Sequence, residues 1–347
     1  MVNRTDPTSN APIMMLSAGN GFIMQSEKYS RDNAGQSLKK YILLKKGELA
    51  YNHGASKAKQ YGCCYELTEN EARIPYVYHC FKISGTEHTP YVATALNNPK
   101  IDRQLKRLVS SSVRMDGLLN ISFDDYMSVI LHLPSLKEQT HIADFLKKLD
   151  ERITSQEKLV ASLKKYKRGL LSNAFRNASS WRKKRLGEIC CIRTGKLDAN
   201  AMVNDGKYPF FTCARERYSI DTYAFDTDAL LISGNGANVG YIHHYTGKFN
   251  AYQRTYVLDQ FQEDINYVHV FLNRFLSSRI DAEKKAGNTP YIVLSTLSDM
   301  EIYIPDETTT KQLVDLFTQI ENRISYSATV LEYLSSQRRG LLQQLFI

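Results

Sequence analysis

Two segments of this sequence repeat each other without a gap, and this repeat is the strongest constraint on the fold. Residues 133–175 align with residues 304–346 at an offset of 171 positions (305 − 134). The matched pairs are Pro134 with Pro305, Asp144 with Asp315, Arg152 with Arg323, Leu163 with Leu334, Gly169 with Gly340 and Phe175 with Phe346. A gapless match over about forty residues predicts that the chain builds the same structure twice.

Both copies carry apolar residues at alternating steps of three and four, and this heptad spacing predicts long helices that pair. The residues expected to pair the helices are Ile142, Leu149, Ile153, Leu163 and Leu170 in the first copy, and Leu313, Ile320, Ile324, Leu334 and Leu341 in the second. Phe145 and Leu316 occupy seam positions as well. Two ordinary core helices are the plainer interpretation, but length and duplication favour a paired spacer of roughly 60 Å.

Polar residues interrupt the two seams at matching positions. Gln156 corresponds to Ser327, and Lys167 corresponds to Arg338. Polar residues in such a seam can fix the register or the orientation of the paired helices at some cost in stability. We expect these four residues to have that role.

The segments before the two helices correspond more faintly, and each predicts a globular module. Residues 90–97 resemble residues 266–273, and residues 46–51 parallel residues 228–232, where an apolar strand enters a glycine-rich turn. Because the two modules differ in sequence while the two helices are similar, we expect two modules with different recognition targets joined by one common helical scaffold. The predicted boundaries are 1–132 for the first module, 133–176 for the first helical region, 177–303 for the second module and 304–347 for the second helical region.

The composition is that of a globular chain with buried cores, since 43% of its 347 residues are hydrophobic and 23% are charged. It contains no run of eighteen apolar residues, and residues 1–6 lack the layout of a secretory signal, so we expect a cytoplasmic protein without a membrane span. The six cysteines form no C-x-x-C, and the pair His243–His244 has no cysteine pair at zinc-site spacing. We therefore expect reduced thiols and no metal site.

The formal net charge of +9 favours a polyanionic partner, because lysine and arginine release the counterions condensed on a phosphate backbone. Any single charge is more often a solvated surface group, but together the basic residues account for the charge balance. Arginine can read guanine bidentately, whereas lysine on phosphate positions the protein. The residues expected to contact DNA are Lys57, Lys59, Arg103, Arg107, Arg114, Arg193, Lys196, Arg215, Arg217, Asn235, Asn238, Arg254, Lys284 and Lys285.

Motifs that suggest catalysis or cofactor binding fall short of their requirements. In Gly234-x-Gly236-x-x-x-Gly240 the third glycine comes one residue late and a strand follows, whereas a dinucleotide loop opens a helix. The loop either holds Asn235 and Asn238 near DNA or is a structural hairpin. Residues 288–291 read Asn-Thr-Pro-Tyr, close to the Asn-Pro-Pro-Tyr of amino-methyltransferases, but no glycine-rich AdoMet loop stands at the right distance. We expect no catalytic residues.

As an ordered set, several motifs make the chain resemble the specificity (S) subunits of type I restriction-modification enzymes. The first helix opens with the run LPSLKEQ at residues 133–139 and ends near RGLL at residues 168–171. The second module opens with WRKKRLGEI at residues 181–189, and GNGANVG at residues 234–240 and GNT at residues 287–289 also fit. The match covers nearly the whole chain, and the set is specific although each motif alone is weak.

The resemblance implies an α+β fold with two target-recognition domains separated by two long helices that pair as an antiparallel coiled coil, with a pseudo-twofold internal repeat. Each domain would read one half of a split sequence in double-stranded DNA. The helices would set the spacing of the half-sites and dock two methyltransferase (M) subunits, which restriction (R) subunits would join. The chain would have no catalysis and no cofactor of its own, with AdoMet, ATP and magnesium on its partners only.

The first module departs from the pattern of the family. In the second module 28 residues separate Trp181 from Pro209, whereas the apparent counterpart Pro12 lies only eleven residues from the start. The first target-recognition domain is therefore expected to be shortened at its N-terminal side. The alternative function is a truncated or silent variant that acts only in assembly, and sequence-specific DNA binding separates the two hypotheses.

Overall fold

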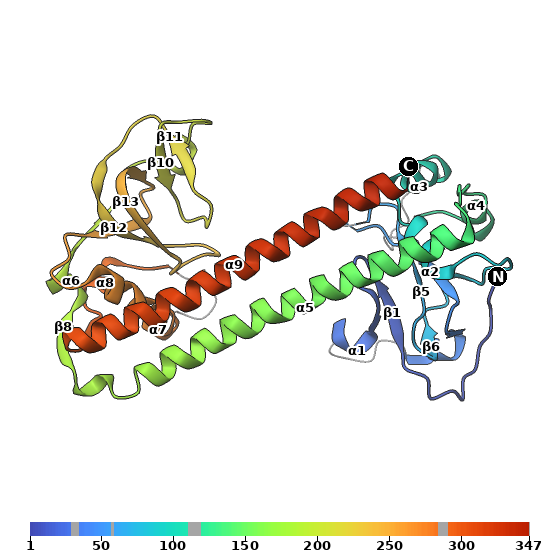
Figure 1. Cartoon of the computed structure of the whole chain (residues 1–347), viewed down its shortest axis with the longest axis horizontal. Helices are drawn as coiled ribbons and strands as arrows, with labels where there is room; N and C mark the ends of the chain where they lie inside the picture. Colours follow the sequence, from blue (N-terminus) through green and yellow to red (C-terminus); the bar gives the residue numbers. More distant parts are fainter. Residues whose placement is uncertain (29–34, 57–58, 110–118, 284–290, 347) are drawn as a thin grey trace. The chain divides into compact units, whose positions relative to one another are not determined.

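The computed structural model describes residues 1–28, 35–56, 59–109, 119–283 and 291–346. They divide into two compact units (Figure 1). Unit 1 consists of Met1–Ser155 and Leu331–Ile347, and unit 2 consists of Gln156–Val330. Each unit therefore combines one globular module with a stretch of both long helices.

The module of unit 1 is built from short antiparallel strands with short helices beside them. Its strands are β1 (Met14–Ser17), β2 (Gly21–Met24), β3 (Ile42–Lys45), β4 (Leu49–Asn52), β5 (Cys63–Glu66), β6 (Glu71–Ile74) and β7 (His79–Phe81). They pair as β1-β2, β3-β6 and β5-β4-β7. The helices are α1 (Gln25–Lys28), η1 (Gly35–Lys40), α2 (Thr89–Ala95), α3 (Pro99–Leu108) and α4 (Phe123–Met127).

Aromatic stacking joins α4 to the strands of unit 1. The rings of Tyr51 and Tyr126 lie 3.8 Å apart between centroids and are nearly parallel. His53 bridges two segments, because its ring nitrogens lie 2.8 Å from the carbonyl oxygen of Leu119 and 3.0 Å from that of Val77. A core of this kind holds strands of only three or four residues, which could not form a stable sheet alone.

The module of unit 2 is built around a larger sheet. Its strands are β8 (Arg182–Arg185), β9 (Cys191–Thr194), β10 (Tyr208–Phe211), β11 (Tyr218–Ile220), β12 (Phe225–Ser233), β13 (Ile242–Ala251), β14 (Thr255–Asp259) and β15 (Glu301–Ile304). Among the described residues six of them form one sheet in the order β11-β10-β13-β12-β14-β9, and β15 pairs with β8. The helices are η2 (Ala178–Ser180), α6 (Leu186–Ile189), η3 (Ala199–Ala201), α7 (Ile265–Glu283) and α8 (Leu294–Ser298).

From Ala229 to Ser233, the central strand β12 is buried on both faces. Leu230 and Ile232 belong to a large apolar cluster with α7, whereas Ala229 and Leu231 belong to a second cluster with Phe249. Successive side chains of a strand point to opposite faces, so a continuous apolar run fits a strand that is covered on both sides. This packing fixes the positions of the loops at the strand ends.

The repeated segments form two helices of 39 residues each, α5 (Leu136–Ala174) and α9 (Glu307–Leu345). Residues at equivalent positions cap their N-termini. Ser135 Oγ accepts a hydrogen bond from Glu138 N at 3.4 Å, and Asp306 Oδ1 accepts one from Thr309 N at 2.9 Å. Such side chains satisfy backbone donors that have no partner inside the helix.

In unit 2 the two helices contact each other and run antiparallel. Leu163 packs with Ile320 and Ile324 in one buried cluster. Gln156 Nε2 donates a hydrogen bond to the carbonyl oxygen of Ser327 at 2.8 Å, so the two polar seam residues bind each other. Farther along α5, Lys167 forms an ion pair with Glu321, which precedes Ser327 on α9.

In unit 1 the other ends of the same helices also run antiparallel. Arg338 forms a bidentate ion pair with Asp150, with a distance of 3.0 Å between its NH2 group and Oδ2. Nearer the start of α5, Ile142 and Phe346 pack on one small cluster. At the offset of 171 residues Asp150 becomes Glu321 and Lys167 becomes Arg338, so the two ion pairs are copies of one interaction.

The structure corrects two of the expected seam positions. Phe145 is 51% exposed and Leu316 is 39% exposed, while the next residues, Leu146 and Phe317, are 4% and 7% exposed. Phe317 belongs to the main core cluster of unit 2, so this part of α9 packs on its module as well as on the partner helix. At Phe317, packing on the module rotates the buried stripe of α9 away from the heptad seam. The ten other expected seam residues are buried or half-buried.

Candidate nucleic-acid interface

Loops from separate strands of unit 2 converge on the tight turn at residues 252–254. Gly234 N donates to the carbonyl oxygen of Arg254 at 2.9 Å, and Cys213 Sγ donates to the same oxygen at 3.4 Å. Gln253 N donates to the carbonyl oxygen of Leu197 at 2.9 Å. These bonds tie the loops after β9, β10 and β12 to one turn, so their side chains share one surface.

The glycine loop after β12 is shaped by close backbone contacts. A Cβ atom on Gly234 would lie 2.4 Å from the carbonyl oxygen of Arg254, so a side chain there would force the turn apart. Gly236 and Gly240 have φ values of 80° and 79°, which only glycine adopts without strain. The loop leads into β13, so no helix N-terminus follows to hold a dinucleotide phosphate.

The predicted asparagines of this loop have different roles. Asn238 Nδ2 donates to the carbonyl oxygen of Cys213 at 3.2 Å and so ties two loops together. Asn235 forms an isolated backbone bridge with Tyr291, which leaves its side-chain amide outside that bridge. The loop is thus both a structural hairpin and a platform for polar side chains.

We call the exposed and half-buried polar side chains of these segments the loop surface. It comprises Lys196, Arg215, Arg217, Asn235, Asn238, Tyr241, Gln253, Arg254 and Tyr291. Arg215 lies over the ring of Tyr241, 5.4 Å from the ring centroid, and Tyr291 is 57% exposed. Guanidinium, amide and phenol groups together offer phosphate neutralisation and hydrogen bonding to base edges.

A cavity of about 300 Å³ lies at the centre of the loop surface. Gly234, Gln253, Arg254, Tyr256 and Tyr291 are among the residues that line it. Tyr256 Oη donates to the carbonyl oxygen of Ile292 at 3.0 Å, which holds this wall in place. A concave site with an arginine, an amide and an exposed phenol suits a base edge better than an apolar ligand.

His243 supports the loop surface in its neutral form. Burial lowers its pKa below the usual value for histidine, although Nε2 lies 3.2 Å from the carbonyl oxygen of Ala214. The nearby Arg217 also lowers the pKa. The positive charge of the surface therefore comes from its arginines and lysine at neutral pH.

Arg193 has a structural partner that the sequence did not indicate. Its guanidinium forms an ion pair with Asp259, whose side chain is 1% exposed, and lies 5.3 Å from the centroid of the Phe225 ring. Leaving a buried carboxylate without a partner is costly, so this arginine is needed by the fold. We leave it out of the loop surface.

In unit 1 the predicted basic residues fall into two groups. Arg103 and Arg107 are exposed one turn apart on α3, whose Ile101 and Leu105 are buried. Lys59 Nζ donates to the carbonyl oxygen of Asn97 at 2.6 Å, so it is partly committed to the fold. The predicted residues Lys57, Arg114, Lys284 and Lys285 lie outside the described residues.

Sequence reasoning missed three members of the loop surface, Tyr241, Gln253 and Tyr291. The turn that carries Gln253 is short and holds no charge run, and Tyr291 comes from a segment about forty residues farther along the chain. The backbone bridge between Asn235 and Tyr291 and the hydrogen bond from Ile292 N to the carbonyl oxygen of Gly234 bring that segment to the glycine loop. The one signal in the sequence was the position of Tyr241 directly after Gly240.

Two further observations concern metal sites and membrane spans. Over residues 1–28, 35–56, 59–109, 119–283 and 291–346, no group of three or more histidine, cysteine, aspartate or glutamate side chains is placed to hold a metal ion. Within the same ranges, no helix combines the length and apolar character needed to span a bilayer.

Comparison with known proteins shows which proteins this chain is similar to. Residues 178–334 match the family model of the type I restriction modification DNA specificity domain. The specificity subunit of the type I restriction enzyme EcoDI of Escherichia coli is 37% identical to this chain over 166 residues, which cover 47% of this chain and 37% of that subunit. The chain thus spans little more than a third of the length of this curated relative.

Two solved structures extend the likeness to the rest of the fold. The S subunit of a type I restriction-modification system from M. genitalium matches 99% of this chain and 90% of its own, with a TM-score of 0.65 and 17% identity. A chain from a structural study of complex assembly in the type I system matches 100% of this chain and 94% of its own, with a TM-score of 0.54 and 16% identity. The predicted resemblance to specificity subunits and the predicted mixed α+β class are confirmed.

Proposed function

We propose that this chain is the DNA-recognition subunit of a type I restriction-modification complex. The observation that carries the proposal is the loop surface of the specificity domain, where Gln253, Arg254 and Tyr291 line one cavity and Arg215 lies over the ring of Tyr241. Arginine and amide side chains are those that read base edges in the major groove. The net charge of +9 supplies the attraction to phosphate that does not depend on sequence.

The target is expected to be bipartite, with one half read by each unit. Unit 2 reads with the loop surface, and unit 1 offers the exposed Arg103 and Arg107 of α3. Since the two modules differ in sequence, their half-sites differ as well. The division 1–132, 133–176, 177–303 and 304–347 describes this organisation as two readers and two helical regions.

The long helices are proposed to pair as an antiparallel coiled coil and to dock two methyltransferase subunits, which restriction subunits then join. Phe145 and Leu316 support this role, because they are large apolar side chains left exposed at equivalent positions of the two helices. Exposed apolar groups rimmed by polar residues are typical of interaction sites. Methylation and cleavage belong to the partners, which also bind AdoMet, ATP and magnesium.

One observation favours a second candidate, a specificity subunit whose shortened first module serves assembly only. In unit 2 the residues before α9 form β15 and pair with β8, whereas the equivalent residues 130–133 of unit 1 form no strand. A module that lacks this pairing can keep its helix contacts and lose its reading surface. The two candidates differ in whether the first half-site exists.

The deciding experiment co-expresses this chain with the methyltransferase subunit encoded beside it and maps methylated adenines in the host genome. A split motif with two defined halves and a fixed gap supports the first proposal. Arg254→Ala is expected to weaken binding of the mapped duplex by one to three kilocalories per mole, roughly five- to 150-fold, and to relax one position of the motif. Co-purification with the partner but no methylation would instead favour the assembly candidate.

Docking is tested separately from reading. The double variant Phe145→Ser and Leu316→Ser is expected to bind less methyltransferase while the chain keeps its thermal stability, because both side chains are exposed in the free chain. A matched control changes Leu159, 41% exposed on α5, to serine. Equal capture of the partner by all three proteins would show that Phe145 and Leu316 are not the docking sites.

A further inference from the structure

The same turn precedes the second helical region in unit 2 and the first helical region in unit 1. Met300 N donates to the carbonyl oxygen of Leu297 at 3.1 Å, and Val129 N donates to that of Tyr126 at 3.4 Å. These four residues are equivalent at the offset of 171, and each turn follows a helix of five residues, α8 or α4. The chain therefore enters residues 301–304 and 130–133 in the same way.

Only one of these two segments finds a strand partner. In unit 2, residues 301–304 pair antiparallel with residues 182–185. In unit 1, among the residues that the structure describes, no hydrogen bond is made by the backbone N–H and C=O groups of Leu131 and Leu133. Backbone groups that could extend a sheet are thus left open beside the start of α5.

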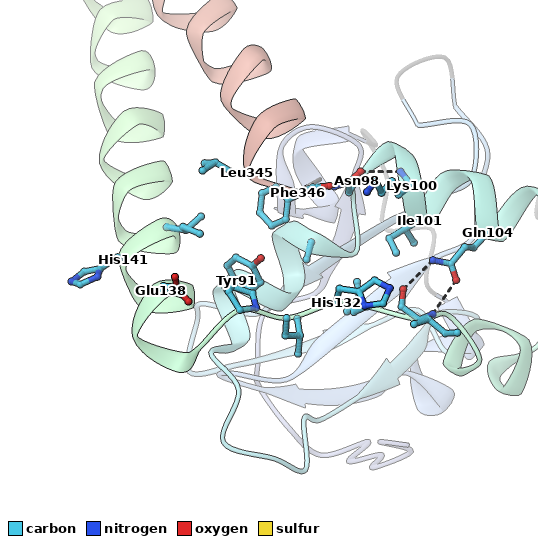
Figure 2. A pocket seen from close by; sticks show the side chains of 16 residues that line it. Tyr91, Asn98, Lys100, Ile101, Gln104, His132, Glu138, His141, Leu345 and Phe346 are labelled. Carbon is cyan, nitrogen blue, oxygen red and sulfur yellow. Dashed lines mark hydrogen bonds between the residues drawn. The ribbon is translucent and has the colours of Figure 1, made fainter.

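A cavity of about 440 Å³ lies beside this open segment. Tyr91 of α2, His132, Leu133 and Phe346 are among its lining residues (Figure 2). Leu133 is 37% exposed, whereas its counterpart Ile304 in unit 2 is 6% exposed. Among the described residues, no strand of unit 1 therefore covers the surface that β8 covers in unit 2.

Register assigns the backbone groups of unit 1 that correspond to those facing β8 in unit 2. Leu186 N donates to the carbonyl oxygen of Met300 at 2.9 Å, so residues 300, 302 and 304 are those whose backbone faces β8. Their counterparts are 129, 131 and 133. Gln104 binds both backbone groups of Ile130 at 2.9 and 3.0 Å, as the dashed lines in Figure 2 show, and so occupies only the opposite side.

Unit 2 shows which side chains cover such a surface. Trp181 packs edge-on against Phe175, with 5.7 Å between ring centroids. Arg182 and Lys184 both bind Glu263, at 2.9 and 3.0 Å. The covering segment is thus an aromatic residue followed by an extended basic stretch.

Unit 1 carries equivalent groups without that segment. Phe346 occupies the position of Phe175 and packs against Tyr91, with 5.2 Å between ring centroids. Glu87 stands four residues before Tyr91, as Glu263 stands four residues before Tyr267, and it accepts a hydrogen bond from Gln139. Unit 1 therefore has both an apolar surface, formed by Phe346 and Tyr91, and a carboxylate, that of Glu87, which could bind a further strand.

We propose that this groove of unit 1 binds an extended segment of a different polypeptide, antiparallel to residues 130–133. An aromatic side chain of that segment packs on Phe346, and a basic side chain pairs with Glu87. A second copy of this chain is a poorer source, because its residues 181–186 are already paired in its own unit 2. Moving them would break as many hydrogen bonds as it forms. Strand addition of this kind takes its affinity from backbone hydrogen bonds.

The test uses the full chain and a fluorescein-labelled peptide of residues 177–189, whose binding is followed by anisotropy. The Glu87→Lys variant is expected to weaken binding at least tenfold. A peptide with glutamate at the positions of Arg182 and Lys184 is expected to bind Glu87→Lys better than it binds the original chain. The matched control is Glu263→Lys, because a peptide that instead displaces β8 from unit 2 would respond to that change and not to Glu87→Lys.

Backbone methylation of the peptide tests the register. A methyl group on the nitrogen of Lys184 blocks a donor that faces residue 131, so binding is expected to weaken at least about fivefold, the loss of one hydrogen bond. A methyl group on the nitrogen of Lys183, which faces away, is expected to have little effect. Equal effects at both positions would indicate that the peptide binds by charge attraction and not by strand pairing, and would overturn the proposal.

Light scattering decides the source of the segment. The proposal expects a monomer that binds one peptide per chain. A dimer that the peptide dissociates would assign the groove to a second copy and overturn the choice of a different polypeptide. No peptide binding to a folded chain would reject the groove altogether, and because the assay contains no DNA, neither result depends on the proposed reading function.

Discussion

His269 is a histidine that unit 2 holds in its neutral form. It lies on α7, with its ring 5.5 Å from that of Phe317 and 5.9 Å from that of His244, measured between centroids. Burial, together with the nearby His244 and Lys167, lowers its pKa to about 4. Since histidine in an unfolded chain has a pKa of about 6.5, acid protonates the unfolded chain first.

This shift predicts acid sensitivity. The contribution of a neutral His269 to stability is fully present above pH 6.5 and falls as the pH drops toward 4, because the unfolded state then binds more protons. At pH 5 the loss is expected to be about 2 kcal/mol for this residue alone. In thermal unfolding, the loss of stability between pH 7 and pH 5 should therefore be smaller for His269→Phe than for the original chain.

His244 offers the control for that measurement. It is also a histidine of unit 2, but it binds the exposed carboxylate of Asp228, with 2.9 Å between Nε2 and Oδ1. Because His244 contributes less than burial to the low pKa of His269, His244→Phe is expected to reduce the acid-induced loss without removing it. If the loss persists in His269→Phe and disappears in His244→Phe, the buried histidine is not its source.

Single residues of the site were predictable only where their chemistry is local. The arginines and asparagines of the loop surface stand in sequences that already suggest loops, so residue type was enough to find them. Arg193 shows the limit, since its buried partner Asp259 lies 66 positions away along the chain. Tyr291 shows it too, because its place depends on a backbone bridge between distant segments.

At the scale of elements, the paired helices are held by one interaction used twice. Arg338 binds Asp150, and Lys167 binds Glu321 at the equivalent position. The side chains of Arg338 and Asp150 are 37% and 46% exposed, so the pair is worth at most about 1 kcal/mol in water. The ion pair contributes more to specifying the antiparallel orientation of the two helices, since a parallel arrangement would separate Arg338 from Asp150.

The orientation can be tested by exchanging charges. Asp150→Arg is expected to lower the thermal midpoint of the chain by a few degrees, because two arginines then face each other. Combining it with Arg338→Asp should restore most of that loss, and the coupling between the two changes measures the contact. Asp144→Arg, an exposed change on the same helix, serves as the control, and additive effects of the two exchanges would contradict the observed pairing.

The helices were the most predictable elements, because a heptad pattern is read from spacing alone and the repeat confirms it internally. The seam failed at Phe145 and Leu316, where the next residue is the buried one. A straight α-helix has 3.6 residues per turn, whereas the heptad pattern repeats every 3.5 residues. The heptad positions therefore stay on the buried face only where the helix packs against its partner helix alone. The modules add a second surface that the sequence pattern could not reveal.

At the scale of the whole molecule, the proposed function makes the helices a ruler for DNA. The boundary between the units falls after Ser155 in α5 and after Val330 in α9. One heptad inserted at both places lengthens each helix by about 10.5 Å while it keeps the seam in phase. At about 3.4 Å per base pair, the gap of the methylated motif should grow by about three base pairs.

Methylation mapping of this variant decides the point. An unchanged gap would show that the helices do not set the spacing of the half-sites. Insertion into α5 alone is the control, because it shifts the Arg338–Asp150 contact out of register with the Lys167–Glu321 contact. That variant is expected to lose stability and methylation together.

The duplicated ion pair also bears on how such a chain can be divided. Asp150 and Lys167 lie on α5, and Glu321 and Arg338 hold the same places on α9, so each helix carries one acid and one base. In an antiparallel pair made of two copies of the same helix, the acidic residue of each copy would face the basic residue of the other at both positions. A half-length chain is thus self-complementary, and its homodimer would have a true twofold axis. Two identical readers related by that axis would select a palindrome.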